Sequence, residues 1–385
     1  MRRILITEES DASGNPLISW GDVAGSVGNF GTILPLFFAV SLTTGMPLSL
    51  MLLLCGGWYI ISGLIYQIPI PVEPLKAIAA VAIAEQISPG MIAASGILIG
   101  LLFLILGLSK GMQRMREWIP LAVIRGIQLG LGLILLRSAI FSFGLQDPFF
   151  FLVCIGIIIL FLLIRHIRDV PDLSALCILG LGVGVVIHTI GIPVIAFPRL
   201  PILIIPNLTE YLNAGVLLVI PQIPLTLANA VLATSLLATE LYNRPVSPDK
   251  LSLTIGIMSL STSMLGGFPM CHGAGGVAAH YRFGARHGSA LIIGGIILIV
   301  ASTLLTNPKT LDAIPDGVFG ALLLAVAIEL IKHGAKTDNR LITGIIAILA
   351  IPAGIAPAFG GGLIMSAIFR YHSHKAKNYT NIKEQ

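Results

Sequence analysis

The sequence predicts an all-α membrane protein of about 14 transmembrane segments, arranged as two inverted repeats of seven. Three observations support this fold class: the composition, the number of apolar stretches and an internal repeat. Of the 385 residues, 56% are hydrophobic and 11% are charged, whereas about 25% are charged in a typical soluble domain. Little polar material is left for a soluble catalytic domain, so most of the chain is expected to lie in lipid.

Apolar stretches fill most of the chain. A spanning helix needs about 20 mostly apolar residues. Two stretches, 68–87 and 268–283, are apolar but short and interrupted by Pro or Gly. We expect half-helices there, at the third and tenth positions of the series. The remaining twelve stretches, the last of them shorter, are 29–45, 47–66, 91–108, 119–140, 149–164, 173–190, 214–238, 251–265, 289–305, 317–331, 341–357 and 361–369.

An internal repeat relates the two halves of this series. Ile119–Leu129 parallels Ile314–Leu324, 195 residues later, and each opens a span. The broken segments correspond at nearly the same offset. Seven segments per half is an odd number, so the second half must cross the membrane upside down, as in the inverted repeats of secondary transporters. The expected domains are a cytoplasmic segment at 1–28, a first repeat at 29–200, a second repeat at 201–370 and a cytoplasmic tail at 371–385.

The basic residues indicate the topology. Short cytoplasmic loops of membrane proteins are rich in Lys and Arg. With the N-terminus inside, all but four of the 23 Lys and Arg residues fall in inner segments. Membrane topology therefore explains the net charge of +5, and no nucleic-acid partner is expected. We predict a multi-pass protein of the cell membrane (inner or plasma) with both termini in the cytoplasm. The polar segment 1–28 lacks the apolar run of a cleaved signal peptide.

The first broken segment contains three prolines within six residues, Pro69, Pro71 and Pro74. They force an extended chain, after which a helix can begin near Pro74. A helix N-terminus within the membrane attracts an anion through its free N–H groups and its dipole. Glu73 and Lys76 lie on one side of that start. They belong either to a binding site or to a structural ion pair.

The second broken segment, 266–286, is rich in glycine. Gly273, Gly275 and Gly276 allow close approach of a ligand to the backbone. Two half-helix N-termini facing each other would surround a small anion with N–H donors. Tight packing against neighbouring helices is the alternative explanation of these glycines.

Polar residues follow one face of the first span of the second half. Gln222, Thr226 and Asn229 share a helical face, and a polar stripe at membrane depth is expected to face a cavity or the bundle interior. Asn29 and Thr32 are their counterparts in the first span. Hydrogen bonding between helices is the alternative role. Three acidic residues nearer the span ends, interpreted as interfacial or structural, are Glu85, Glu240 and Glu329.

Three motifs closely resemble the plant-type molybdate transporter family, a branch related to the SulP sulfate permeases. They are Pro-Ile-Pro-Val-Glu-Pro-Leu-Lys at 69–76, Pro-Met-Cys-His-Gly-Ala-Gly-Gly at 269–276 and Tyr-Arg-Phe-Gly-Ala-Arg at 281–286. The resemblance covers essentially the whole chain. It suggests a bacterial or archaeal member that lacks the soluble STAS domain of SulP relatives.

The resemblance implies core and gate domains, with an anion bound between the third and tenth helices. The implied substrate-binding residues are Asn29, Thr32, Pro71, Val72, Glu73, Lys76, Gln222, Thr226, Asn229, His272, Gly273, Ala274, Gly275 and Gly276. Members of the family commonly have Gln and Met where this chain has Glu73 and Leu75. A carboxylate at this place would repel an anion unless it is protonated or paired with Lys76.

The leading hypothesis is a secondary active transporter of a tetrahedral oxyanion, molybdate first, that works by alternating access. Proton symport is an expectation from the family, with Glu73 and His272 as candidate titrating groups. A sulfate or tungstate transporter and an anion channel of the same fold are the alternatives. An enzyme is remote, because H-E-x-x-H and serine-nucleophile motifs are absent, and no P-loop for ATP occurs. We expect no cofactor and no metal site. The expected partners are the oxyanion and membrane lipid, and the sequence leaves open whether the protein forms a homodimer.

Overall fold

The structure is a computed structural model that describes residues 19–112, 120–168, 171–198 and 200–366. Most of the predicted segment 1–28 and the whole predicted tail 371–385 lie outside these residues. Within the described part, seven helices are long and apolar enough to cross a membrane, and four further apolar helices are shorter. The first candidate span begins at Trp20, inside the stretch that the sequence analysis assigned to the cytoplasm.

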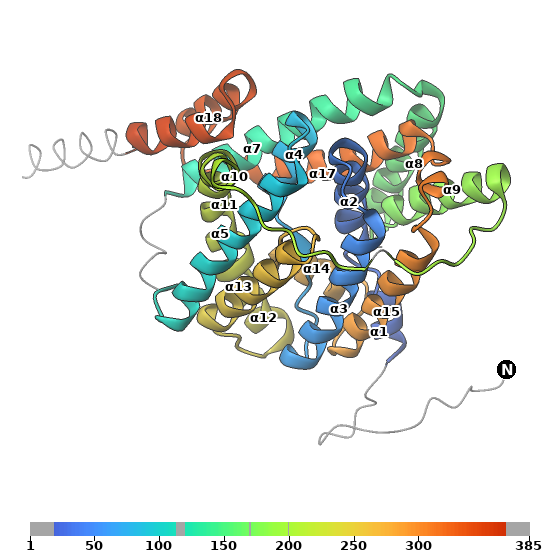
Figure 1. Cartoon of the computed structure of the whole chain (residues 1–385), viewed down its shortest axis with the longest axis horizontal. Helices are drawn as coiled ribbons and strands as arrows, with labels where there is room; N and C mark the ends of the chain where they lie inside the picture. Colours follow the sequence, from blue (N-terminus) through green and yellow to red (C-terminus); the bar gives the residue numbers. More distant parts are fainter. Residues whose placement is uncertain (1–18, 113–119, 169–170, 199, 367–385) are drawn as a thin grey trace, which may run out of the picture.

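The helices and strands form two series of seven segments (Figure 1). The first comprises α1 (Trp20–Gly25) with α2 (Phe30–Thr44), α3 (Leu48–Tyr66), β1 (Glu73–Pro74) with α4 (Lys76–Glu85), α5 (Pro89–Leu108), α7 (Leu121–Arg137) with η1 (Ser138–Gly144), α8 (Pro148–Ile167) and α9 (Ser174–Ile190).

The second series starts with a long bent segment. It consists of α10 (Leu208–Ala214), the π-helical turns η2 (Gly215–Val219) and η3 (Thr226–Ala233), and α11 (Ile220–Leu225) and α12 (Thr234–Tyr242). The rest comprises α13 (Pro248–Met264), β2 (Met270–Cys271) with α14 (Ala274–Arg282), α15 (Ser289–Leu304), the short α16 (Pro308–Asp312), α17 (Asp316–Gly334), α18 (Arg340–Ala353) and the helix Ile355–Ser366. The predicted fourteen segments are therefore confirmed, with half-helices at the third and tenth.

Packing between the two series follows the symmetry of an inverted repeat. Helix α3 packs against α15, and its repeat counterpart α13 packs against α5, the counterpart of α15. Glycines bring both pairs close: a Cβ on Gly56 would lie 2.6 Å from the carbonyl oxygen of Gly295, and one on Gly256 would lie 2.9 Å from that of Gly100. Small residues permit such close approach of membrane helices.

The two broken segments meet at the centre of the fold. Strands β1 and β2 pair antiparallel, with Glu73 opposite Cys271 and Pro74 opposite Met270. The Leu75 N–H donates to the Pro269 carbonyl at 3.1 Å. Because this pairing keeps the chain extended through Leu75, α4 begins at Lys76, two residues later than the predicted start near Pro74.

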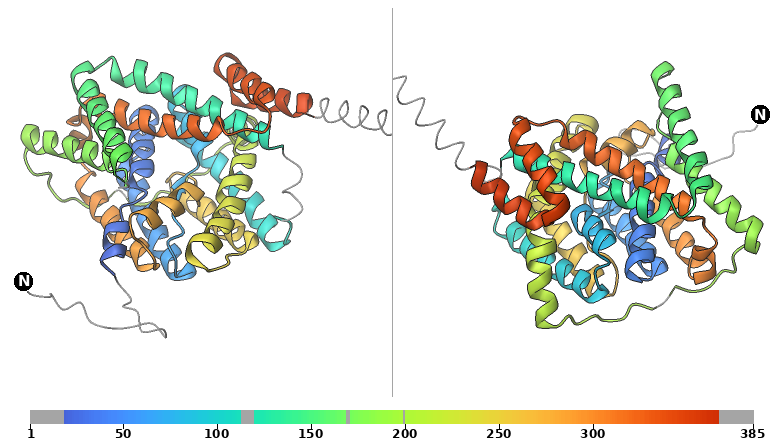
Figure 2. Two further views of the ribbon diagram at one scale, coloured as in Figure 1. Left: turned by 180° about the vertical axis from the view of Figure 1, so that it is seen from behind. Right: turned by 90° about the horizontal axis from the view of Figure 1, so that it is seen from above.

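Helices α3, α5, α13 and α15 form one group around the two broken segments, and a second group of helices packs against it. Helix α7 packs along α17 and α18, and α17 also contacts η1, α8 and α9. Figure 2 shows α7 and α17 crossing one side of the molecule, with the blue, cyan and yellow helices on the other side. This division corresponds to the gate and core domains that the resemblance implies.

Candidate functional site

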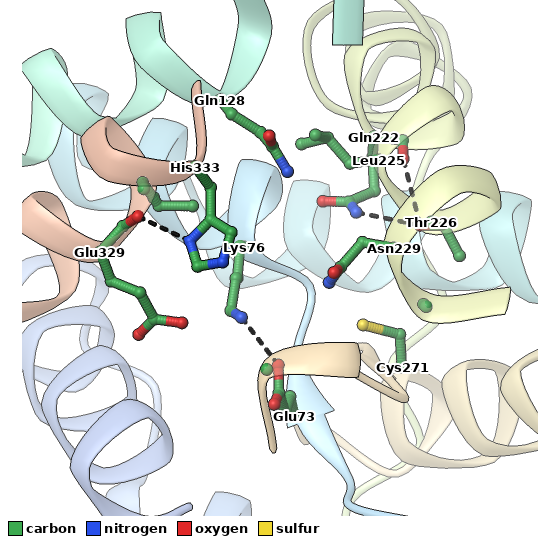
Figure 3. Close-up of a pocket in the computed structure, with 13 residues that line it drawn as sticks. Glu73, Lys76, Gln128, Gln222, Leu225, Thr226, Asn229, Cys271, Glu329 and His333 are labelled. Carbon is green, nitrogen blue, oxygen red and sulfur yellow. Dashed lines mark hydrogen bonds and ion pairs between the residues drawn. The ribbon is translucent and has the colours of Figure 1, made fainter. Parts of the chain in front are cut away.

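A small polar cavity of about 40 Å³ lies where the crossing of the half-helices meets the gate. This volume exceeds the roughly 10–15 Å³ needed to hold a water molecule. Core and gate both contribute to its walls (Figure 3). The lining residues are Glu73, Lys76, Gln128, Gln222, Leu225, Thr226, Asn229, Ala230, Cys271, Gly275, Glu329, Leu330 and His333.

An ion pair between half-buried Lys76 and buried Glu73 lines this cavity. Lys76 Nζ lies 2.9 Å from Glu73 Oε2, and the Glu73 side chain is 1% exposed. Among the described residues, no hydrogen-bond donor other than Lys76 reaches the carboxylate. The carboxylate also packs on the first turn of α14, where a Cβ on Gly276 would lie 2.5 Å from Glu73 Oε1. Negative charge is favourable at a helix N-terminus, so Glu73 lies where an incoming anion would also be attracted.

Gln222 connects the polar stripe to the first half-helix. Its Oε1 accepts hydrogen bonds from the backbone N–H groups of Ala77 at 2.9 Å and Ile78 at 3.3 Å. Its Nε2 donates to Thr226 Oγ1 at 3.0 Å. Two N–H groups of the α4 N-terminus, which the sequence analysis left free for an anion, therefore have an acceptor from the protein itself. Gln222 therefore bonds to another helix and also lines the cavity, whereas Thr226 lines the cavity and bonds only to Gln222 within its own segment.

A second cavity of about 420 Å³ adjoins the first. Asn29 and Thr32 line this larger cavity and not the smaller one. Three basic residues from distant segments, Arg165, Arg282 and Lys332, also line it. All three belong to the segments that the charge pattern predicts on the cytoplasmic side. The residues common to both cavities are Gly275, Glu329 and His333.

Several predicted site residues lie near the cavities without lining either of them. His272 is buried; its Nδ1 lies 2.8 Å from the Pro71 carbonyl oxygen and its Nε2 lies 2.8 Å from Thr254 Oγ1. The contact with Pro71 joins the two broken segments, and the contact with Thr254 attaches the second segment to α13. The predicted residues that line neither cavity are Pro71, Val72, His272, Gly273, Ala274 and Gly276.

The third motif, residues 281–286, lies at the end of α14 and has a structural role in this fold. Buried Asp22 accepts hydrogen bonds from the backbone N–H groups of Arg286 at 2.8 Å and His287 at 3.0 Å. The side chain of His287 also pairs with Asp22, at 2.9 Å. Gly284 has φ +102° and packs against Gly21. The motif therefore attaches α1 to the turn that joins α14 to α15.

Seven residues that line the small cavity are absent from the predicted site. Three are apolar, and the other four are Gln128, Cys271, Glu329 and His333. Glu329 was interpreted as interfacial or structural, yet it lines both cavities. A polar residue within an apolar span could have indicated Gln128, because such residues face the bundle interior. No group of acidic, His and Cys side chains in the described residues is suited to hold a metal ion.

Fold and site together define a membrane transporter with inverted repeats and a charged central site. Two solved structures share its fold. The transmembrane domain of the bicarbonate transporter BicA from a cyanobacterium matches with a TM-score of 0.63 at 19% identity, over 90% of this chain and 98% of that one. SLC26A9 matches with a TM-score of 0.65 at 14% identity, over 90% of this chain and 64% of that one.

Sequence comparison gives the family. The family described as "Molybdate transporter of MFS superfamily" matches residues 21–135 and 214–330. Molybdate transporter 2 of Arabidopsis thaliana is 30% identical over 95% of this chain and 90% of its own length. Molybdate transporter 1 of the same plant is 31% identical over 83% of this chain and 80% of its own length. The chain belongs to the molybdate transporter family, and it is an anion transporter, not an enzyme.

The two matched stretches reflect the internal repeat. They start 193 residues apart and end 195 residues apart, close to the offset of 195 between the repeated segments. The family description names the MFS superfamily, whose members have two halves of six segments each. The seven segments per half and the paired half-helices of this chain match the BicA and SLC26A9 fold instead.

Proposed function

We propose that this protein is a secondary active transporter of molybdate that works by alternating access and couples uptake to protons. One observation carries the proposal: a small polar cavity with a half-buried Lys lies between the core and the gate and adjoins a larger cavity lined by basic residues. A movement of the core relative to the gate would change the side of the membrane from which the small cavity is accessible. Binding at the meeting point of half-helices is typical of transporters with inverted repeats.

The site suits an oxyanion because Lys76 supplies a positive charge and amide groups supply neutral donors. Gln128 and Asn229 line the cavity together with Lys76. A tetrahedral oxyanion accepts hydrogen bonds on all its oxygens, and hydrogen bonds to ionised groups are stronger than neutral ones. Sulfate and tungstate share this chemistry, so they are the competing substrates to test.

For proton coupling, the geometry favours Glu73 over His272. Glu73 is paired with the cation of the site and lines the cavity. Both ring nitrogens of His272 are engaged away from the cavity. A proton on Glu73 would remove its charge and release Lys76 to face the anion. Proton and anion would then bind together, as symport requires.

The test is uptake of molybdate into proteoliposomes with and without an inward proton gradient. We expect uptake to rise with the gradient and to be inhibited by excess unlabelled molybdate more strongly than by sulfate or tungstate. Uptake that is indifferent to the gradient would refute the coupling. Electrical recordings distinguish the channel alternative, because a channel carries anion current whose reversal potential is independent of the proton gradient.

A further inference from the structure

Gln128 is the gate residue whose polar group reaches the small cavity from α7. Its side chain is 7% exposed, and Figure 3 shows its amide directed toward the cavity, facing the side that carries Gln222 and Asn229. The core contributes Lys76 and Glu73 to the same cavity. An oxyanion in this space would therefore have Gln128 on its gate side.

Arg125 determines which end of the Gln128 amide faces the cavity. Arg125 Nη1 donates a hydrogen bond of 2.9 Å to Gln128 Oε1, and residues three apart on a helix are neighbours. A guanidinium group has only donors. The amide oxygen must therefore face Arg125, which leaves the NH₂ group of Gln128 on the other side. The usual ambiguity between amide oxygen and nitrogen is removed by the chemistry of the partner.

The amide group of the other glutamine of the cavity, Gln222, already has hydrogen-bond partners at both its oxygen and its nitrogen. Gln222 Oε1 accepts from the N–H groups of α4, and its Nε2 already donates to Thr226. Gln128 Nε2 makes no hydrogen bond to any residue in the described part of the chain, so its two N–H groups are available to a ligand. Arg125 itself is half-buried, and its Nε has no acceptor among the described residues.

We propose that the Gln128 NH₂ group is a gate-side ligand of the transported oxyanion, and that Arg125 is a positioning residue that orients it. The inference rests on the proposed function. An anion held by Lys76 of the core and Gln128 of the gate links the two bodies directly. Binding therefore favours the conformation in which core and gate approach each other around the substrate.

The experiment measures molybdate binding to purified protein by calorimetry, for wild type, Gln128→Ala, Arg125→Ala and the double variant. Loss of a hydrogen bond to a charged group is expected to weaken binding about tenfold in Gln128→Ala. Arg125→Ala is expected to weaken it similarly. Because Arg125 acts through Gln128, the double variant is expected to bind no more weakly than Gln128→Ala, a coupling that a double-mutant cycle reveals.

Two controls keep the result interpretable. Arg137→Ala removes an exposed basic residue from the same helix, away from both cavities, and is expected to bind as wild type. Arg125→Lys keeps a cationic donor and is expected to recover most of the binding lost in Arg125→Ala. Thermal melting identifies any variant that is misfolded. If Gln128→Ala is misfolded, Gln128→Glu takes its place, because Glu has the same shape but offers an acceptor where Gln offers a donor. Gln128→Glu is expected to abolish binding.

Three outcomes are decisive. Wild-type binding by folded Gln128→Ala or Gln128→Glu would overturn the ligand assignment. Independent, additive losses in the double variant would overturn the positioning role of Arg125. Failure of wild type to bind molybdate, sulfate or tungstate would instead refute the proposed function, so the two failures are distinguishable.

Discussion

Glu73 is a carboxylate placed beside Lys76, the cation of the proposed anion site. It contacts Lys76 at 2.9 Å and packs on the first turn of α14. In the proposed function, a transported anion and Glu73 compete for the same positive charge. Glu73 can then take part in transport only if it changes charge during the cycle.

At the residue scale, Glu73→Gln keeps the shape of the side chain and removes its charge. Because the repulsion of an incoming anion is lost, molybdate binding at neutral pH is expected to strengthen several-fold, and uptake to lose its dependence on the proton gradient. Lys76 then lacks its buried counter-charge until the anion binds, so molybdate is expected to raise the melting temperature more than in wild type.

Calorimetry at two pH values and gradient-driven uptake check this prediction. Glu85→Gln is the matched control, because Glu85 lies on the same helix at its exposed end. Uptake by Glu73→Gln that still follows the gradient would contradict the role of Glu73 and would direct attention to Glu329, the carboxylate that lines both cavities.

At the element scale, the core depends on close contact between α3 and α15. Gly56→Val places a side chain against the Gly295 carbonyl and Ile299. Overpacking typically costs about 1–3 kcal/mol, so the melting temperature in detergent is expected to fall. Gly57→Val is the matched control, since nothing lies within 4 Å of a Cβ at Gly57. Equal melting temperatures for the two variants would contradict the close packing.

At the scale of the whole molecule, alternating access predicts that the larger cavity opens to one side at a time. A cysteine at Ala278, which lines that cavity, is expected to react with a membrane-impermeant thiol reagent from the cytoplasmic side. Molybdate is expected to slow the reaction by favouring closure. The cysteine is introduced into a variant in which the exposed Cys177 is replaced by Ser, so that labelling reports only the new position.

The neighbouring position supplies the control for this measurement. Val277 is buried, and Val277→Cys is expected to stay unlabelled. Labelling of Ala278→Cys from the outside alone would contradict the predicted orientation, and equal labelling with and without molybdate would contradict closure around the substrate.

Local sequence determined much of the architecture because membrane helices leave strong patterns. Apolar stretches gave the fourteen segments, and the prolines at 69, 71 and 74 predicted the first half-helix, since Pro cannot continue a helix. The predicted start of this half-helix, near Pro74, was wrong by two residues. Hydrogen bonding of Leu75 to Pro269 delays it to Lys76, and a contact across 194 residues of sequence cannot be read from a local pattern.

The sequence by itself determined the fold class, the repeat and the family, because each depends on composition or on residues close in the chain. Only the tertiary structure decided which polar groups face the cavity. Gln222 caps α4, His272 is engaged with Thr254 and Pro71, and Gln128 and Glu329 reach the cavity from the gate. These roles depend on how separate helices pack together, and the physical reason is that a hydrogen-bond partner or a cavity wall is supplied by a distant segment.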